Sequence, residues 1–132
     1  MKIILSIAFT LFYFQIIFSQ SDSSGYVGKI IPSESSTWTD DTTGYEITQW
    51  TTNSSSYHPY FTVDSFIDDE TAIIYSYRTG KKQLYKLDLK SGEMIQMTNA
   101  QTVSRIEHLP KYKTLWYING KILTEVNTST LE

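Results

Sequence analysis

The sequence predicts an all-β fold, organised as part of a β-propeller, and three observations support this prediction. Hydrophobic residues make up 40% of the chain and aromatic residues 14%, which is enough to fill a core. Short stretches of β-branched and aromatic residues are separated by turns rich in Gly, Asn, Asp and Ser. Similar stretches recur about 40 to 50 residues apart, the period of four-stranded propeller blades. A β-sandwich or barrel, which also has closely spaced strands, is the alternative.

The first 19 residues have the pattern of a secretory signal peptide. Lys2 supplies a positive charge, Ile3 to Phe18 is almost wholly apolar, and Ser19 is a small residue at the expected cleavage point. A membrane-spanning helix is the weaker alternative, because about 16 residues cover about 24 Å of a hydrocarbon core about 30 Å thick. We therefore expect an exported protein, periplasmic or extracellular, with no stable membrane anchor.

Composition excludes several kinds of site and partner. The chain has no cysteine, which excludes disulfides, Cys-ligated zinc and a cysteine nucleophile. Its formal net charge is −3, from 11 basic and 14 acidic residues. A mildly acidic surface argues against nucleic acid as a partner, and it requires that any site for a polyanion be locally basic.

The N-terminal part of the exported chain predicts little regular structure. Residues 20–44 are rich in Ser, Thr, Asp and Gly and are expected to form a flexible segment. The first strand is expected at Tyr45–Thr51, and residues 51–56 predict an exposed loop. A short strand is expected at Tyr60–Val63. Residues 45–132 are then expected to form the N-terminal blades of an incomplete propeller.

Hairpins dominate the rest of the sequence. Strands are expected at Thr71–Tyr77 and Gln83–Leu89, joined by a loop containing Gly80. In the second of these strands Tyr85, Leu87 and Leu89 share one face, whereas Lys86 and Asp88 share the other. Asn119-Gly120 is a strong hairpin signal, because both central residues of a type I′ turn need positive φ. The remaining strands are expected at Glu93–Thr98, Thr114–Ile118 and Lys121–Asn127, with a turn at Pro110 and Lys111.

Two internal echoes support the blade interpretation. Leu84–Asp88 aligns with Leu123–Asn127 at an offset of 39 residues. Glu46–Thr51 aligns with Glu93–Thr98 at an offset of 47. In the second echo, residues 46–51 match the outermost strand of the blade that ends near Thr98. Residues 46–51 nevertheless precede every other expected strand. The sequence thus predicts about two four-stranded blades and one N-terminal strand of a closing blade, with the remaining blades supplied by a longer polypeptide.

Several stretches occur in the order found in a known family. They are Gly28–Glu34, Thr39–Asp40, Thr43–Thr51, His58–Thr62, Tyr77–Gly80, Gln83–Leu89, Ser91–Glu93 and Thr130–Glu132. Together they resemble the N-terminal part of the oligogalacturonate lyases, over about residues 27–132. The segment from Gly28 to Thr51 with His58–Thr62 is the more specific part, whereas the hairpin from Arg78 to Thr98 equally resembles TolB-like propellers.

The resemblance implies a seven-bladed propeller that cleaves pectin-derived oligogalacturonides by β-elimination. In the family a His base abstracts the proton at C5, with an Arg nearby, and Mn²⁺ neutralises the uronate carboxylate and the developing enolate. The metal ligands and the base lie in later blades, so no catalytic or metal-binding residue is assigned in this chain. We expect the 132-residue chain to be inactive alone, as a fragment lacking the catalytic half. The implied partners are oligogalacturonides or other acidic oligosaccharides.

Three residues are candidates for substrate binding. His58 lies between a polar loop and a strand, and can donate to a uronate carboxylate; a packing role beside Tyr57 and Tyr60 is the alternative. Tyr60 can hydrogen-bond or stack on a sugar, or else belong to the core. Arg78, in a basic cluster with Lys81 and Lys82, can clamp a carboxylate, or else be a solvated hairpin tip.

Other polar residues have simpler explanations. His108 is expected to be structural, and two histidines 50 residues apart do not make a metal site. The carboxylates at Asp40–Asp41 and Asp68–Glu70 are explained by turn chemistry.

A non-catalytic TolB-like binding or scaffold module is the alternative function for the whole chain. A relative of the lyases that has lost catalysis is a third possibility.

Overall fold

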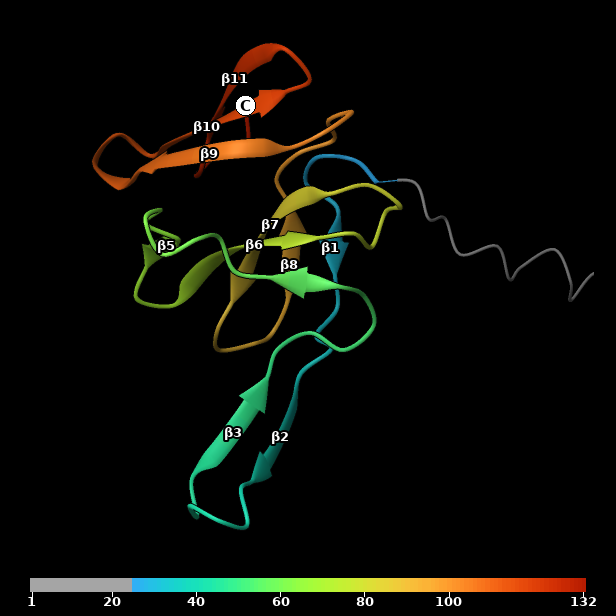
Figure 1. Ribbon diagram of the computed structural model, residues 1–132, viewed down its shortest axis with the longest axis vertical. Coiled ribbons are helices and arrows are strands. Elements are labelled where there is room, and N and C mark those ends of the chain that lie inside the picture. Colours follow the sequence, from blue (N-terminus) through green and yellow to red (C-terminus); the bar gives the residue numbers. More distant parts are fainter. Residues whose placement is uncertain (1–24) are drawn as a thin grey trace, which may run out of the picture.

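The computed structural model describes residues 25–132, which are all-β (Figure 1). The expected signal peptide, residues 1–19, lies outside the described residues. Within 25–132 there are eleven strands and one 3₁₀ turn, with no α-helix, and every strand pairing is antiparallel. None of these residues forms a helix long and apolar enough to cross a membrane. The prediction of an all-β fold is confirmed.

The central sheet contains six strands. Its core is the hairpin of β6 (Thr71–Ser76) and β7 (Gln83–Asp88), in which all six residues of each strand are paired. β8 (Met94–Gln96) extends this hairpin on one side, and β1 (Ile30–Ile31) pairs with β8 although it lies far away in the sequence. In order, the central sheet is β1 (Ile30–Ile31), β8 (Met94–Gln96), β7 (Gln83–Asp88), β6 (Thr71–Ser76) and β4 (Ser56–Tyr57), and β5 (Phe66–Asp68) also pairs with β6.

Two smaller sheets complete the chain. The second sheet has the order β11 (Ile122–Asn127), β10 (Thr114–Asn119), β9 (Ser104–Leu109), and the 3₁₀ turn Pro110–Tyr112 links β9 to β10. β2 (Ser36–Thr39) and β3 (Glu46–Gln49) form a separate hairpin. Figure 1 shows this hairpin extending away from the other two sheets. Trp38 lies on the hairpin, opposite Ile47, and remains 44% exposed.

The main core lies between the central and second sheets. Alternate residues of β6 and β7, such as Ile73 and Leu84, pack against Leu115 of β10 and Val126 of β11. Burial of these apolar surfaces is the main force holding the two sheets together. The outer face of the second sheet carries Trp116, which is 39% exposed.

A second cluster lies on the opposite face of the central sheet. Ile74, Tyr85 and Leu87 are buried there, and Trp50 and Leu89 pack against them partly exposed. The predicted shared face of Tyr85, Leu87 and Leu89 is therefore confirmed. Both faces of the central sheet are covered, which explains the nearly continuous burial of β6.

Within residues 25–132 one turn occurs three times, beginning at Asp40, Asp88 and Asn127. In each copy the side-chain Oδ1 atom accepts hydrogen bonds from the backbone N–H groups two and three residues later, at 2.7–3.2 Å. The backbone C=O of the first residue accepts from the N–H four residues later, and its N–H donates to the C=O five residues later. The fifth position has positive φ in every copy: 72° at Gly44, 76° at Gly92 and 67° at Leu131.

The repeated turn confirms one echo and corrects the other. Asp88 and Asn127 are separated by the expected 39 residues. Asp40 and Asp88 are separated by 48, so Tyr45, not Glu46, is equivalent to Glu93. The expected offset of 47 was wrong by one residue, a shift that exchanges the two faces of a strand. Structurally, the hairpin β2–β3 corresponds to β7–β8.

Blade boundaries differ from the prediction. Sheets of six, three and two strands replace two blades of four, and no sheet closes. The expected closing-blade strand, β3, pairs with β2. Two strands, β1 and β2, precede residue 45, where the first strand was expected, and β9 was not expected at all.

Two local predictions were wrong. Residues 60–63 form a turn, closed by a hydrogen bond from Val63 N–H to the C=O of Tyr60, instead of a strand. In the β10–β11 hairpin Asn119 pairs with Ile122, so the loop residues are Gly120 and Lys121. Only Gly120 of this pair has positive φ, at 65°, as in a type II′ turn.

Candidate functional site

A pocket of about 570 Å³ opens between the central sheet and β9, and we call it the inter-sheet pocket. Its size is within the range of pockets that bind small molecules. Residues 57–63 form one wall, Tyr75 and Lys82 come from the β6–β7 hairpin, and Arg105 comes from β9. No Asp or Glu among the described residues lines it.

His58 lies on the wall of this pocket, as its candidate role requires. Its side chain shares a hydrogen bond, through Nε2, with the hydroxyl of the buried Ser65. Its ring lies 6.2 Å from the ring of Phe66, measured between centroids. The residue remains exposed, so the ring is oriented by Ser65 and Phe66 and still accessible from the pocket.

Tyr60 lies on the same pocket and is 70% exposed. Its ring contacts that of Phe61, which is 79% exposed, with 4.3 Å between centroids. The two rings form an exposed apolar surface beside the pocket, of the kind on which a sugar ring packs. The alternative prediction, a place in the core, is wrong.

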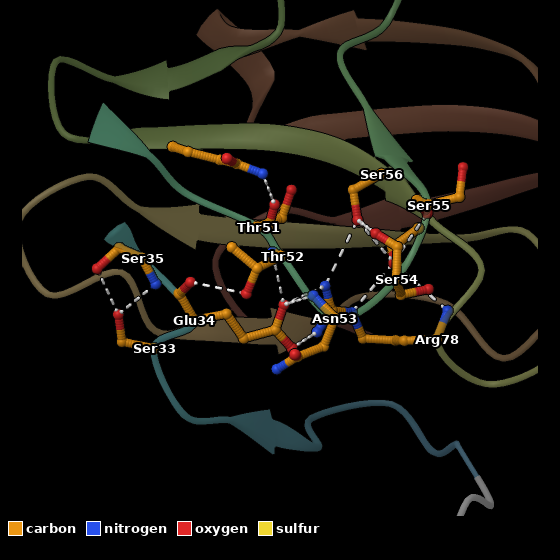
Figure 2. A network of polar contacts seen from close by, with 12 residues as sticks. Ser33, Glu34, Ser35, Thr51, Thr52, Asn53, Ser54, Ser55, Ser56 and Arg78 are labelled. Carbon is orange, nitrogen blue, oxygen red and sulfur yellow. Dashed lines mark hydrogen bonds and ion pairs between the residues drawn. The ribbon is translucent and has the colours of Figure 1, made fainter. Parts of the chain in front are cut away.

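Arg78 is placed differently from both expectations. Its guanidinium lies in the network of Figure 2, where Nη1 donates to Glu34 Oε1 at 2.5 Å, and only 7% of the Arg78 side chain is exposed. Nε donates to Ser76 Oγ at 3.1 Å, and Nη2 donates to Ser56 Oγ at 3.4 Å. Arg78 is therefore neither a solvated hairpin tip nor part of the inter-sheet pocket's wall.

Glu34 connects Arg78 to the loop that precedes the pocket wall. Its Oε2 atom accepts hydrogen bonds from the backbone N–H groups of Thr52 and Asn53, at 3.3 and 3.2 Å. Burial tends to raise the pKa of this carboxyl, but the hydrogen bond from Arg78, those from the backbone and the charge of Arg78 hold the pKa below its usual value. The network in Figure 2 thus fixes the loop of residues 51–56. Tyr57 and His58 follow this loop in the chain.

A second pocket, of about 370 Å³, lies on the other face of the central sheet. Trp50, Ile74 and Leu87 line it together with other apolar residues, so we call it the apolar pocket. His58 and Tyr57 line both pockets and therefore stand between them. The apolar pocket continues the second hydrophobic cluster and offers few polar groups to a ligand.

The manganese implied by the resemblance has no ligand set among residues 25–132. No three His, Asp or Glu side chains in this part of the chain are close enough together to hold a metal ion. His108, expected to be structural, is buried, and its Nδ1 atom lies 2.8 Å from the backbone C=O of Asp64. Residues 25–132 therefore do not fit a metal centre.

Sequence reasoning missed Arg105 and treated Lys82 only as part of a basic cluster. Arg105 stands between Ser104 and Ile106, outside any basic cluster or motif that would mark it as a binding residue. Arg105 lines the pocket because the second sheet packs on the central sheet. Local sequence patterns do not predict such contacts between sheets.

Comparison with solved structures identifies related folds. An oligogalacturonate lyase in complex with manganese matches with a TM-score of 0.73 and 26% identity, over 82% of this chain and 30% of that one. An oligogalacturonate lyase from Vibrio parahaemolyticus matches with a TM-score of 0.72 and 20% identity, over 81% of this chain and 30% of that one. This chain therefore spans about 30% of the length of each matched structure.

Sequence comparisons alone give no such match. No family model matches the chain, and no curated protein matches it. The likeness to the lyases therefore rests on the fold and on the 26% identity to one of the two solved structures. The resemblance to the oligogalacturonate lyase family that the sequence predicts is confirmed.

Proposed function

We propose that this chain binds pectin-derived oligogalacturonides, or other acidic oligosaccharides, as one part of an oligogalacturonate lyase-like protein. The observation that carries the proposal is the inter-sheet pocket. It is lined by tyrosines, a histidine and two cations, without a carboxylate, in a chain whose formal net charge is −3. A polyanion is the ligand class that such a locally basic pocket favours over a neutral one.

In this proposal the chain supplies binding, and other parts of the protein supply the chemistry. The solved lyases are longer, with only 30% of each covered by this chain, and one of them is a manganese complex. The ligands for Mn²⁺ and the base for β-elimination belong to the remaining parts. His58 and Tyr60 are substrate-binding residues in this scheme, whereas Arg78 acts indirectly, by fixing the loop before His58.

The hairpin β2–β3 fits the same scheme as the outer half of another blade. It repeats the turn that joins β7 to β8, and its two strands pair only with each other among the described residues. Trp38 and Ile47 leave apolar surface exposed on it. We expect inner strands from elsewhere in a propeller to cover this surface and to pair with β2.

Calorimetric titration with trigalacturonate tests the binding proposal. We expect trigalacturonate to bind, and galactotriose, a neutral oligosaccharide of the same length, to bind much more weakly. Affinity for trigalacturonate should fall as salt is raised, because the attraction is electrostatic. Equal affinity for the two sugars, or no affinity for either, would contradict the proposal.

A lyase assay tests the division of roles. The absorbance of unsaturated product should not rise when this chain alone is mixed with trigalacturonate and Mn²⁺. Product formation by the chain alone would show that the catalytic groups lie within it, contrary to the proposal.

A further inference from the structure

We propose that Lys82 and Arg105 form a subsite for one carboxylate group, which distinguishes a free uronate from its methyl ester. The inference rests on the proposed function, because it names the groups that would recognise the acidic sugar. The two side chains come from different sheets, Lys82 from the β6–β7 hairpin and Arg105 from β9. A carboxylate bound between them would therefore connect the central sheet to the second sheet.

The charges in the pocket are not neutralised by any of residues 25–132. Among the described residues neither Lys82 nor Arg105 takes part in an ion pair, and no Asp or Glu lines the pocket. Other cations are engaged elsewhere, as Arg78 is by Glu34 and Lys90 is by Glu70. Two free cations beside one pocket attract an anion, and a carboxylate accepts hydrogen bonds from both.

Lys82 is held in position by an aromatic ring. Its Nζ atom lies 4.8 Å from the centroid of the Tyr75 ring, and Tyr75 is itself 8% exposed and fixed in the main core. The ring face attracts the ammonium group without using its N–H donors on another acceptor. Lys81, the adjacent residue, is exposed and does not line the pocket, which makes it a natural comparison.

Arg105 is placed by a strained bulge in β9. Its φ is 47°, and the pairing with β10 shifts register there, since Glu107 pairs with Trp116 but Ser104 pairs with Ile118. The other non-glycine residues with positive φ, Lys113 and Leu131, lie in turns. Arg105 alone among residues 25–132 has this conformation inside a strand.

The bulge supports a binding role for Arg105. Bulges redirect side chains and are common beside binding sites, and strained backbone persists where the surrounding structure enforces it. Here Arg105 is exposed and lines the inter-sheet pocket, and its guanidinium makes no hydrogen bond with any described residue. Its parallel N–H donors match the two oxygens of a carboxylate, which an ester does not present as a charged pair.

The test compares Lys82→Gln and Arg105→Gln with Lys81→Gln and Lys121→Gln. Each variant removes one positive charge, but Lys81 and Lys121 do not line the pocket. We expect the first two variants to weaken trigalacturonate binding at least about tenfold, because each loses a charged hydrogen bond. The two control variants should stay within about twofold, since a distant exposed charge is screened by salt. Fully methyl-esterified trigalacturonate should bind the wild type at least about tenfold more weakly than the free acid.

Arg105→Gly separates binding from folding. Glycine adopts positive φ without strain, so this variant should be at least as stable as the wild type and still lose at least about tenfold in affinity. Circular dichroism and urea unfolding check that it is folded. Unchanged affinity in folded Arg105→Gly and Lys82→Gln would overturn the subsite.

The outcomes separate this inference from the proposed function. If trigalacturonate binds with equal affinity to all these variants but more weakly to Tyr60→Ala, the subsite is wrong and the proposed function stands. If trigalacturonate does not bind but galacturonate monomer shifts the Arg105 Nε–Hε NMR signal, the subsite stands and the oligosaccharide function is wrong. If neither sugar has an effect, both are wrong.

Discussion

Glu34 and Arg78 lie 44 residues apart in the chain, and their side chains form a buried ion pair with 9% and 7% of their surfaces exposed. The pair joins the segment before β2 to the second residue after β6 (Figure 2). A close approach nearby supports this attachment, because a Cβ on Gly92 would lie 2.2 Å from Ser33 Oγ. The N-terminal segment is thus held to the central sheet by β1, Glu34 and Gly92.

Breaking the ion pair should destabilise the protein. Glu34→Gln or Arg78→Gln should each lower the free energy of unfolding by about 1.5–3 kcal/mol, the range for hydrogen bonds to charged groups. In the double variant the two losses should not add, because both remove the same interaction. Urea unfolding of the four proteins measures this coupling.

Glu70→Gln is the matched control for Glu34→Gln. Lys90 and Glu70 form an ion pair at the same distance, 2.5 Å, but with 70% and 55% of their side chains exposed. Exposed pairs contribute at most about 1 kcal/mol, so this variant should have little effect. Equal losses from Glu34→Gln and Glu70→Gln would show that burial of the Arg78 pair does not matter.

Acid should remove the contribution of Glu34. Its pKa in the folded protein is lowered, so its stabilisation is present above the pKa of the unfolded chain and disappears as pH falls through the folded value. The difference in unfolding free energy between wild type and Glu34→Gln should therefore shrink below about pH 5. Thermal or urea unfolding at several pH values measures it. A difference that stays constant down to pH 3 would contradict the assignment.

The contact between the two larger sheets should depend on Leu115. This residue is fully buried in the main core, so Leu115→Ala should cost about 2–5 kcal/mol. Leu123→Ala on β11 is the control, since Leu123 is 61% exposed and should change stability by less than about 0.5 kcal/mol. Urea midpoints at an unchanged m-value would give both numbers.

Burial raises the pKa of several tyrosines, and Tyr57 should titrate near the top of the alkaline range. Burial, the hydrogen bond with Tyr77 and the neighbouring phenols of Tyr77 and Tyr75 raise the pKa of Tyr57 to about 12. Because the folded pKa is raised, the associated stability is complete below about pH 10 and is lost as pH rises towards 12. Phenolate absorbance near pH 12 should be smaller by one tyrosine's share in Tyr57→Phe than in the wild type. In concentrated urea the protein is unfolded, so the late ionisation should also disappear from the wild type.

Local hairpins could be predicted from the sequence because their signals are local. The alternation in Gln83–Leu89 and the glycines at the turns place β6, β7, β10 and β11 within one or two residues. β1 could not be predicted in this way, because two residues form a strand only when β8 is beside them. In β9 the alternation of exposed Arg105 and Glu107 with buried Ile106 and His108 is present, but the bulge and the charges conceal it.

The lining of the inter-sheet pocket could be predicted only in part, for the same reason. His58 and Tyr60 share a pocket wall because they are neighbours in one loop. The partner of Arg78 and the position of Arg105 both depend on segments packed from far away in the chain. The local basic cluster indicated Arg78 but gave no indication of Arg105, and the pocket is lined by Lys82 and Arg105 from two sheets.

The tryptophans can report separately on the unfolding of the three sheets. Trp38 lies on the protruding hairpin, Trp50 packs on the central sheet and Trp116 lies on the second sheet. The chain contains only these three indoles, so replacing any two by Phe leaves a single fluorophore reporting on a single sheet. In the variant that keeps Trp38, the emission would change when another strand packs against the β2–β3 hairpin. The variants that keep Trp50 or Trp116 would report on the central sheet and the second sheet.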